Sequence, residues 1–324
     1  MFRFKQMLVA ITLVSFFSPS SAHSMPLRKC VGEFSTRLQH SAKVDANCSS
    51  GTLRVNNKFD VAIPDQGGSL DISWLSDDAQ ANTPTEIRIS HDSTEVLVSV
   101  KGERKSIINR AAISGSYVIN QVDRGCSSDS HSVLNPFNPN GFDWYYSAIG
   151  EPSGHSNAIY RVGGAFKTWK NETNRCGVSE RANALAVNYL GLTNNPEAMG
   201  GNPPPYTPNC LSTRIVDGYN VVGWGLLPTG VIAMSCVSHT SSGVWDSDIR
   251  FSTSYNWFTE ATSSGCSNSY DLGDIATHEV GHILGMGHSD AGTDQVMNPN
   301  AFGCNFWNRK LAKGDLLGFQ NIWG

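Results

Sequence analysis

Three absences in this sequence of 324 residues each exclude a class of protein or site. There is no block of like charge and the formal net charge is only −4, so we expect no nucleic acid partner. Beyond the N-terminus no apolar run is long enough to cross a bilayer, so we expect no membrane anchor. No two cysteines form a C-x-x-C pair, which argues against a zinc site made of cysteines. With 40% apolar and 16% charged residues, the chain still has enough apolar side chains for a sizeable core.

The N-terminus has the pattern of a secretory signal. Arg3 and Lys5 precede a mostly apolar run of 11 residues at 7–17, and small residues follow up to Ala22. The run is too short to span a bilayer. We therefore predict that residues 1–22 are a cleaved signal peptide. The remaining chain is expected to be exported, to the extracellular space or a periplasm, and to work as a monomer.

All eight cysteines follow this signal. An even number of cysteines in an exported chain predicts that all are paired, in four disulfides. Their order along the chain favours sequential pairing, which is one choice among the many connectivities that eight cysteines allow. The expected pairs are Cys30–Cys48, Cys126–Cys176, Cys210–Cys236 and Cys266–Cys304.

Residues 23–125 are rich in strand signals and poor in helix signals. Residues 85–90 and 95–100 alternate apolar and polar side chains on either side of a polar break, which predicts a hairpin. Residues 70–74 alternate in the same way. No catalytic or metal-binding pattern is visible in this region. A propeptide, an accessory β module and an extension of the domain that follows remain open as interpretations.

Residues 126–324 have the pattern of a second domain, which starts with a turn-rich stretch at 126–155. A helix with apolar residues along one face is predicted next, and we assign that face to core packing. Several strands and a late helix follow, which predicts an α+β fold, an α/β sandwich on a mixed and twisted sheet. The first helix carries Ile159, Val162, Phe166 and Trp169; the strands are expected at 220–225, 230–234 and 248–252; residues 182–192 are ambiguous.

Residues 278–288 read H-E-V-G-H-I-L-G-M-G-H and carry the strongest chemical signal. If this stretch is a helix that starts after an N-cap at Asp271, His278 and His282 lie one turn apart on the same face. Neutral imidazoles placed in this way can each give one nitrogen to a zinc ion. Glu279 lies next to the first histidine, where its carboxylate can reach a water at the metal rather than the metal itself.

A third ligand is expected where the helix ends. Gly285 can adopt the positive φ that terminates a helix, so the chain can turn back and bring His288 to the same metal. Three histidines leave the fourth position of a tetrahedral zinc open, which is typical of a catalytic rather than a structural site. The sequence therefore predicts one Zn²⁺ held by His278, His282 and His288. A helix that carries these histidines by chance is the alternative, and the long spacing pattern disfavours it.

This combination resembles the metzincin metallopeptidases and, within them, the matrixins, the family of the matrix metalloproteinases and their microbial relatives. Residues 278–288 match the long zinc motif of the family in full. Ser289 follows the third histidine, as it does in matrixins, and Met297 fits the Met-turn that lies beneath the metal histidines. Residues 311–319 are similar to the closing helix of the family. The resemblance covers residues 126–324.

The resemblance implies a secreted zinc endopeptidase with Glu279 as the general base. It also implies that an extended protein or peptide substrate pairs with an edge strand at Ile232, Ala233 and Met234, and that the loop at 298–310 shapes a side-chain pocket. Two other functions compete with this interpretation. A secreted binding or adhesion protein on a peptidase scaffold is disfavoured because the ligands and the base are all present. A zinc amidase is disfavoured by the long motif and the Met-turn.

The chain departs from the family at its second metal site. Met234 and Arg250 stand where matrixins have histidines for a structural zinc, so we expect no second zinc. Asp217, Asp246 or Asp248 could hold Ca²⁺, but roles in loops and caps are the favoured interpretation. Disulfides are expected to supply rigidity instead.

Latency is the second departure from the family. Matrixins often keep a propeptide cysteine on the zinc within a Pro-Arg-Cys-Gly segment. Arg175, Cys176 and Gly177 look locally similar but lie inside the predicted second domain. We therefore interpret Cys176 as half of a disulfide rather than as a thiol that blocks the metal.

Overall fold

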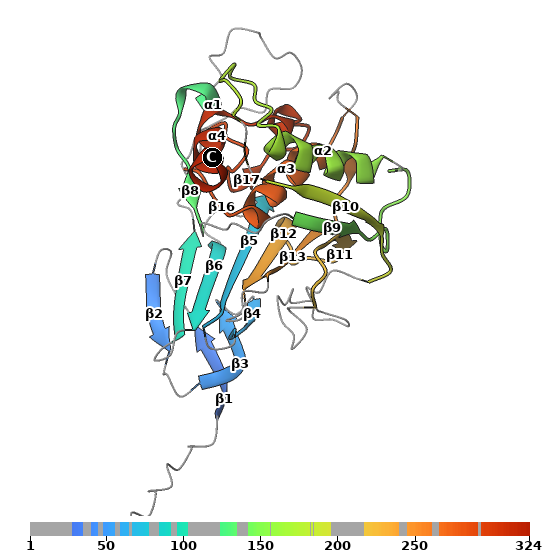
Figure 1. Cartoon of the computed structure of the whole chain (residues 1–324). Helices are drawn as coiled ribbons and strands as arrows, with labels where there is room; N and C mark the ends of the chain where they lie inside the picture. The colour runs from blue at the N-terminus through green and yellow to red at the C-terminus, as the bar shows by residue number, and fades with distance from the viewer. Residues whose placement is uncertain are drawn as a thin grey trace, which may run out of the picture.

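The protein, described here by a computed structural model, is built on a 10-stranded mixed sheet to which both halves of the chain contribute (Figure 1). The order of the strands is β10-β9-β11-β13-β12-β5-β6-β7-β2, and β17 pairs with β5 beside this path. The described residues are 28–34, 40–44, 48–55, 59–64, 67–77, 84–91, 96–102, 124–134, 142–155, 157–181, 183, 185–195, 217–239, 245–260, 266–290 and 293–324. The predicted signal peptide at 1–22 lies outside them.

The C-terminal half supplies one side of this sheet. Its strands are β9 (Phe142–Tyr146), β10 (Val187–Leu192), β11 (Val221–Gly225), β12 (Val231–His239) and β13 (Trp245–Ser252). All neighbours among them pair in parallel except β12, which is antiparallel to β13. The predicted strands are thus confirmed, and the ambiguous stretch before Leu192 contains β10. The predicted α+β fold is confirmed as well.

Helices cover this half, where they gather at one end of the molecule (Figure 1). The helices are α1 (Arg124–Ser127), α2 (Ala158–Lys170), α3 (Leu272–Ile283), α4 (Lys313–Trp323) and the short 3₁₀ helix η1 (Trp307–Arg309). Val162, Phe166 and Trp169 of α2 are buried, as the apolar stripe predicted, and they share one core cluster with α3, α4 and the strands. The indole of Trp169 also donates a hydrogen bond of 2.7 Å to the carbonyl of Thr277 in α3.

The N-terminal half extends the same sheet. Its strands are β5 (Ser69–Asp77), β6 (Pro84–His91), β7 (Val96–Gly102) and β2 (His40–Val44), and all neighbours among them are antiparallel. The predicted hairpin is therefore confirmed as β6 and β7. A separate sheet contains β1 (Arg28–Phe34), β3 (Cys48–Val55) and β4 (Phe59–Ala62). Short strands complete the fold: β8 (Ser132–Val133), β14 (Trp257–Phe258), β15 (Tyr270–Asp271), β16 (Met286–Gly287) and β17 (Asn300–Ala301).

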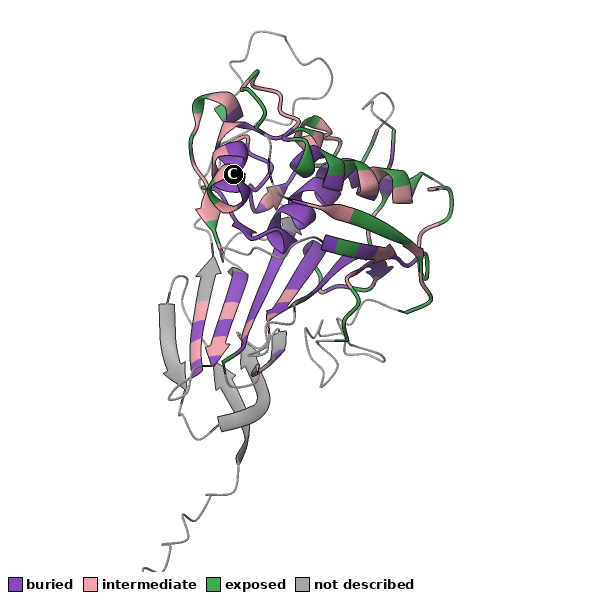
Figure 2. Ribbon diagram, in the orientation of Figure 1, coloured by how far each residue is buried: buried purple, intermediate pink, exposed green. Residues whose placement is uncertain are grey.

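The two halves meet where β5 pairs with β12, and they share a second core cluster there. Leu70, Ile72 and Trp74 of β5 are buried together with Val231 and Met234 of β12. All residues of α3 are buried, and so are most described residues of β5 and β12 (Figure 2). The sheet therefore crosses the boundary that the sequence placed near residue 125. Among the described residues, no helix is both long and apolar enough to cross a membrane.

Candidate metal centre

The metal centre is carried by α3, whose start is held by its own cap. The side chain of Asp271, the predicted N-cap, accepts a hydrogen bond of 2.7 Å from the backbone N–H of Asp274. The guanidinium of Arg309 also donates to the Asp271 carboxylate, at 2.7 Å from Nε. Burial raises the pKa of Asp271, and the Arg309 contact opposes that shift. This cap fixes where the helix begins and so which residues face inward.

The three predicted zinc ligands converge on one point. The Nε2 atom of His282 lies 3.0 Å from that of His278 and 3.1 Å from that of His288, and the third separation is 3.2 Å. Atoms bound at about 2.0–2.1 Å to one tetrahedral metal lie roughly 3.3 Å apart. The ligand atoms form the one such group of histidine, cysteine and acidic side chains found among the described residues. The group therefore fits a zinc ion.

The hydrogen-bond partners of the Nδ1 atoms determine which ring nitrogen carries the proton. Nδ1 of His278 lies 2.7 Å from the carbonyl of Val296, and Nδ1 of His282 lies 2.9 Å from the carbonyl of Met286. A carbonyl only accepts hydrogen bonds, so both Nδ1 atoms carry the proton and both Nε2 atoms keep a lone pair for the metal. Burial, together with the neighbouring imidazoles, lowers the pKa of both rings well below its usual value. The neutral form that a metal requires is thereby favoured.

Glu279 lies beside the histidines and is fully buried. Within the described part of the chain, neither of its carboxylate oxygens has a hydrogen-bond partner. Burial raises its pKa well above the ordinary value, and the nearby Ser235 side chain partly opposes the shift. A buried carboxyl group with free oxygens is costly unless a polar group joins it. Such a group is suited to exchange a proton with a molecule held at the metal.

The end of α3 and the Met-turn both follow the predicted pattern. Gly285 has a φ of 97°, which turns the chain back towards His288. Met297 is fully buried against the zinc helix at Gly281. A Cβ atom on Gly281 would lie 2.3 Å from the Met297 sulfur and 2.7 Å from the Trp169 ring, so only glycine permits this approach.

Asp315 anchors the Met-turn, a role that the sequence did not reveal. Its carboxylate accepts hydrogen bonds from the backbone N–H groups of Val296 at 2.8 Å, Met297 at 3.1 Å and Ala312 at 2.9 Å. The closing helix α4 thereby positions the carbonyl of Val296, which bonds to the first zinc ligand. The resemblance around residues 311–319 was the signal, because it placed this aspartate in a helix that the family uses.

Glu86 is a second residue that the sequence did not reveal, and it comes from the N-terminal half. Its Oε1 atom accepts a hydrogen bond of 2.6 Å from the backbone N–H of His288 and lies 3.1 Å from Nδ1 of the same histidine. All three zinc ligands thus have a polar oxygen at their outer nitrogen. Nothing in the local sequence around residue 86 distinguishes this glutamate from a solvated residue on a strand.

The predicted substrate strand is not an open edge in this structure. Ile232, Ala233 and Met234 are completely buried, and β12 pairs with β13 on one side and with β5 on the other. Figure 1 shows β5 lying between β12 and β6. The backbone groups that would bind an extended substrate are therefore already paired with the chain itself.

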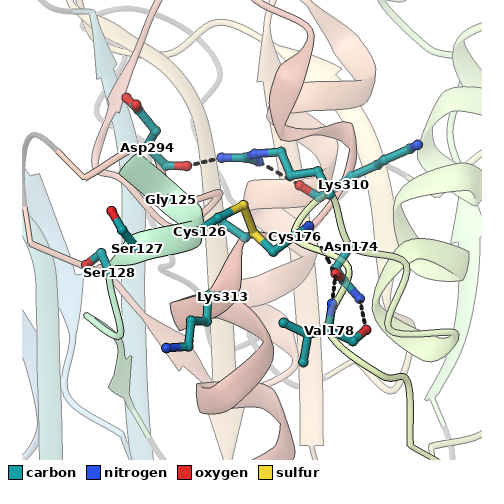
Figure 3. The surroundings of a disulfide bond; sticks show 12 residues. Gly125, Cys126, Ser127, Ser128, Asn174, Cys176, Val178, Asp294, Lys310 and Lys313 are labelled. Atoms are coloured by element: carbon teal, nitrogen blue, oxygen red, sulfur yellow. Dashed lines mark hydrogen bonds between the residues drawn. A yellow bond between two sulfur atoms is a disulfide. The ribbon is translucent and has the colours of Figure 1, made fainter. Parts of the chain in front are cut away.

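Two of the expected disulfides brace the region around the site. Cys126 is bonded to Cys176, and Cys266 before α3 is bonded to Cys304 after the Met-turn. Cys176 is therefore not a thiol available to the metal. Figure 3 shows this bridge in the neighbourhood of Asp294 and Lys310. The backbone carbonyls of these two residues accept hydrogen bonds from the side chain of Arg175. Cys236 is also in a disulfide, and its expected partner Cys210 lies outside the described residues, as do the side chains of Cys30 and Cys48.

The residues at the family's second metal site have other contacts here. Met234 is part of the core shared with β5, and Arg250 packs over Gly225, where a Cβ atom would lie 2.9 Å from Nε. The carboxylate of Asp246 accepts hydrogen bonds from the backbone N–H groups of Asp217 at 2.5 Å and Gly218 at 3.0 Å.

Asp248 acts in the same way as Asp246, because its carboxylate accepts a hydrogen bond of 2.9 Å from the backbone N–H of Val221. These carboxylates therefore have the loop and capping contacts that the sequence favoured over a role in binding Ca²⁺.

Comparison with known proteins agrees with the site. Residues 229–324 match the family described as Matrixin. Metalloendoproteinase 5-MMP from Arabidopsis thaliana is 45% identical over 56 residues, which are 17% of this chain and 14% of that protein. Matrilysin from Homo sapiens is 38% identical over 77 residues, which are 24% of this chain and 27% of that protein. The chain thus covers only a small part of the relatives it matches. The family match at 229–324 includes the three histidines of the metal centre.

Proposed function

From the premise that this chain is a matrixin-like metzincin, we propose that it is a zinc-dependent endopeptidase. The observation that carries this proposal is the convergence of three Nε2 atoms beside the buried carboxyl group of Glu279. The matched metalloendoproteinase and matrilysin support the same activity. Zinc bound there would polarise the scissile carbonyl and make the attacking water more acidic.

The residues of the chain have distinct roles in this proposal. His278, His282 and His288 hold the metal through Nε2. A carboxylate oxygen of Glu279 takes the proton of the attacking water and then delivers it to the nitrogen of the leaving amine. Burial raises the pKa of Glu279, which makes its carboxylate a stronger proton acceptor towards the attacking water. Met297 and its turn support the histidines from below.

The proposal extends to substrate and location. An extended protein or peptide segment binds antiparallel to β12 at Ile232–Met234, and the chain after Met297 shapes the pocket for one of its side chains. Residues 1–22 direct export, 23–125 form an N-terminal region, and 126–324 form the peptidase domain. The exported protein acts as a monomer without a membrane anchor.

The decisive experiment compares the wild type with Glu279→Ala and Glu279→Gln. We expect each variant to retain zinc, measured by elemental analysis, because the three ligands are untouched. Hydrolysis of fluorescent casein, assayed with and without limited trypsin treatment of the chain, should fall at least about 10³-fold. Chelation should abolish wild-type hydrolysis. Unchanged hydrolysis by Glu279→Ala would overturn the role of Glu279.

One observation favours the rival function of a secreted binding or adhesion protein. The ligands and Glu279 are at most 1% exposed in the full chain, which a non-catalytic protein would tolerate. Chelator-sensitive hydrolysis of casein by any form of the wild-type chain would exclude that rival. A zinc amidase would leave casein intact but hydrolyse non-protein amides.

A further inference from the structure

The strand β5 of the N-terminal region lies in the position expected for an extended substrate. It pairs antiparallel with β12, with Leu75 opposite Ala233 and Trp74 opposite Met234. On its other side the end of β5 pairs in parallel with β17, where Asn300 is the partner of Ser76. β17 belongs to the segment after Met297 that we propose as the wall of the side-chain pocket. The end of β5 therefore lies between the two walls of the proposed cleft.

A row of paired residues brings β5 against the catalytic groups. Ser73 of β5 is opposite Ser235 of β12 on one side and opposite Glu86 of β6 on the other. The side chain of Ser235 lies near Glu279 and partly opposes the rise of its pKa. The carboxylate of Glu86 accepts a hydrogen bond from the backbone N–H of His288. β5 therefore lies between two strands whose side chains contact the residues of the metal centre.

Leu75 differs from the other apolar residues of β5 in what it packs against. Leu70, Ile72 and Trp74 belong to the core cluster shared by the N-terminal strands and β12. Leu75 instead belongs to the large core cluster of the C-terminal half, which includes residues of α3, the Met-turn and Ala301 of β17, and it is only 2% exposed. One side chain of β5 thus enters the core of the peptidase domain beside the zinc helix, as a bound substrate side chain would.

Occupancy by β5 and binding of a substrate exclude each other. An extended segment needs the backbone N–H and C=O groups of β12, and β5 already uses them along eight paired positions. The ligands and Glu279 are at most 1% exposed with β5 in place. Hydrolysis of a protein therefore requires β5 to leave.

We propose that β5 is an intramolecular surrogate substrate that keeps the cleft closed, with Leu75 in the pocket that selects the substrate side chain. The proposal rests on the proposed peptidase function and adds its regulation and substrate class. The preferred substrate is an extended segment with a medium-sized aliphatic residue at the position of Leu75. The blocking element is a strand and its leucine, since Cys176 is held in a disulfide.

The test uses the full chain and a charge placed in the pocket. Leu75→Asp puts a carboxylate into an apolar core and should release β5. Leu97→Asp is the matched control, because Leu97 is half-buried on β7, two strands away from β5. We expect freshly purified Leu75→Asp to hydrolyse fluorescent casein at least about 10-fold faster than the wild type, and Leu97→Asp to match the wild type. Leu75→Ala, which disturbs the fold less, should give a smaller increase in the same direction.

A binding measurement separates this proposal from the peptidase function. Each change is repeated in the Glu279→Ala background, and a fluorescent peptide with the sequence of residues 69–77 is titrated by anisotropy. The peptide should bind the Leu75→Asp chain at least about 10-fold more tightly than the chain with intact β5. A peptide with aspartate in place of the leucine that corresponds to Leu75 should bind at least about 10-fold more weakly.

The outcomes are distinct. If no variant hydrolyses casein but the peptide binds as described, the proposed peptidase function is wrong, whereas the proposal that β5 occupies the cleft is supported. The surrogate-substrate proposal is overturned if Leu75→Asp and the wild type hydrolyse casein and bind the peptide equally. It is also overturned if Leu97→Asp produces the same gains as Leu75→Asp, because general loosening of the N-terminal half would then explain both.

Discussion

The two halves of this protein contribute to the metal centre in opposite ways. The C-terminal half brings three histidines, Glu279 and the Met-turn, all of which lie within one short stretch of the chain. The N-terminal half brings Glu86 and the strand β5, which reach the site only through pairing across the sheet. The chemistry is therefore local in sequence, whereas its support and its access depend on long-range contacts.

The largest effect is expected from the loss of one of the histidines by which the C-terminal half alone would hold the metal. His282→Ala removes one of three imidazoles, and the remaining pair cannot hold the metal with the same geometry. We expect zinc to be lost on dialysis, and casein hydrolysis of trypsin-treated chain to fall at least about 10³-fold. Elemental analysis and the hydrolysis rate measure both effects. His239→Ala, a histidine on β12 outside the ligand group, serves as the control and should retain zinc.

The next effect tests the contribution of the N-terminal half to the same ligands. Glu86→Gln keeps the size of the side chain but removes the charge beside Nδ1 of His288. Loss of such an outer partner typically weakens metal affinity by about 10–100-fold. Competition with a chromogenic chelator on the full chain measures that affinity. An affinity equal to that of the wild type would show that Glu86 contributes packing alone.

Packing within the C-terminal half is tested by two glycines with opposite surroundings. Gly281→Ala places a methyl group within 2.3 Å of the Met297 sulfur, and we expect the free energy of unfolding to fall by about 1–3 kcal/mol. Apart from its chain neighbours and the backbone of its own helix, Gly164 of α2 has no atom within 4 Å of an added Cβ, so Gly164→Ala should stabilise the fold by about 0.5–1 kcal/mol. Urea unfolding of the zinc-loaded chain measures both. Equal effects of the two changes would contradict the close packing of α3 on the Met-turn.

The smallest expected effect concerns buried carboxyl groups in the two halves. Burial raises the pKa of Asp246 to about 7, from an unfolded value of about 3.9. The folded chain therefore binds more protons than the unfolded chain between these values, so the contribution of Asp246 to stability falls as pH rises through this window. Asp246→Asn retains acceptors for the Asp217 and Gly218 amides but cannot ionise. Its melting temperature should fall less than that of the wild type between about pH 4 and 7.

Asp71 of the N-terminal half offers the matched measurement. Burial raises its pKa as well, but the Arg88 side chain, whose Nε lies 2.5 Å from Oδ1, opposes the shift. Loss of the ion pair with Arg88 in Asp71→Asn should therefore destabilise the chain at neutral pH. Because the pKa of Asp71 is still raised, this variant should also show a weaker fall of stability with pH than the wild type. Equal changes in stability at neutral pH in Asp71→Asn and Asp246→Asn would remove this distinction between the halves.

Much of the site could be predicted from the sequence because its information is local. The spacing of His278, His282 and His288 depends only on the helical repeat and on a turn at Gly285, and both occur as expected. The N-cap at Asp271 is a short-range hydrogen bond of the same kind. Alternation along 85–90 and 95–100 likewise predicted β6 and β7 correctly, because a hairpin joins neighbours in sequence.

The missed features all join residues that are far apart in the chain. Glu86 and His288 are separated by 202 positions, and Asp315 reaches back 19 positions to Val296. Alternation along β5 predicted a strand but not its partner, since any strand with one apolar face satisfies the same pattern. The resemblance to the matrixins led us to expect an open edge at β12, and the sequence does not reveal that β5 pairs with it.

The sequence by itself indicated the three histidines, Glu279 and the helix that carries them, because their arrangement depends on spacing within one helix and the turn that follows it. It also supported the Cys126–Cys176 and Cys266–Cys304 pairings, which the structure contains. Only the tertiary structure decided that β5 closes the cleft and that Glu86 supports the third histidine. Backbone pairing between distant strands follows from the packing of the whole sheet, which no local pattern specifies.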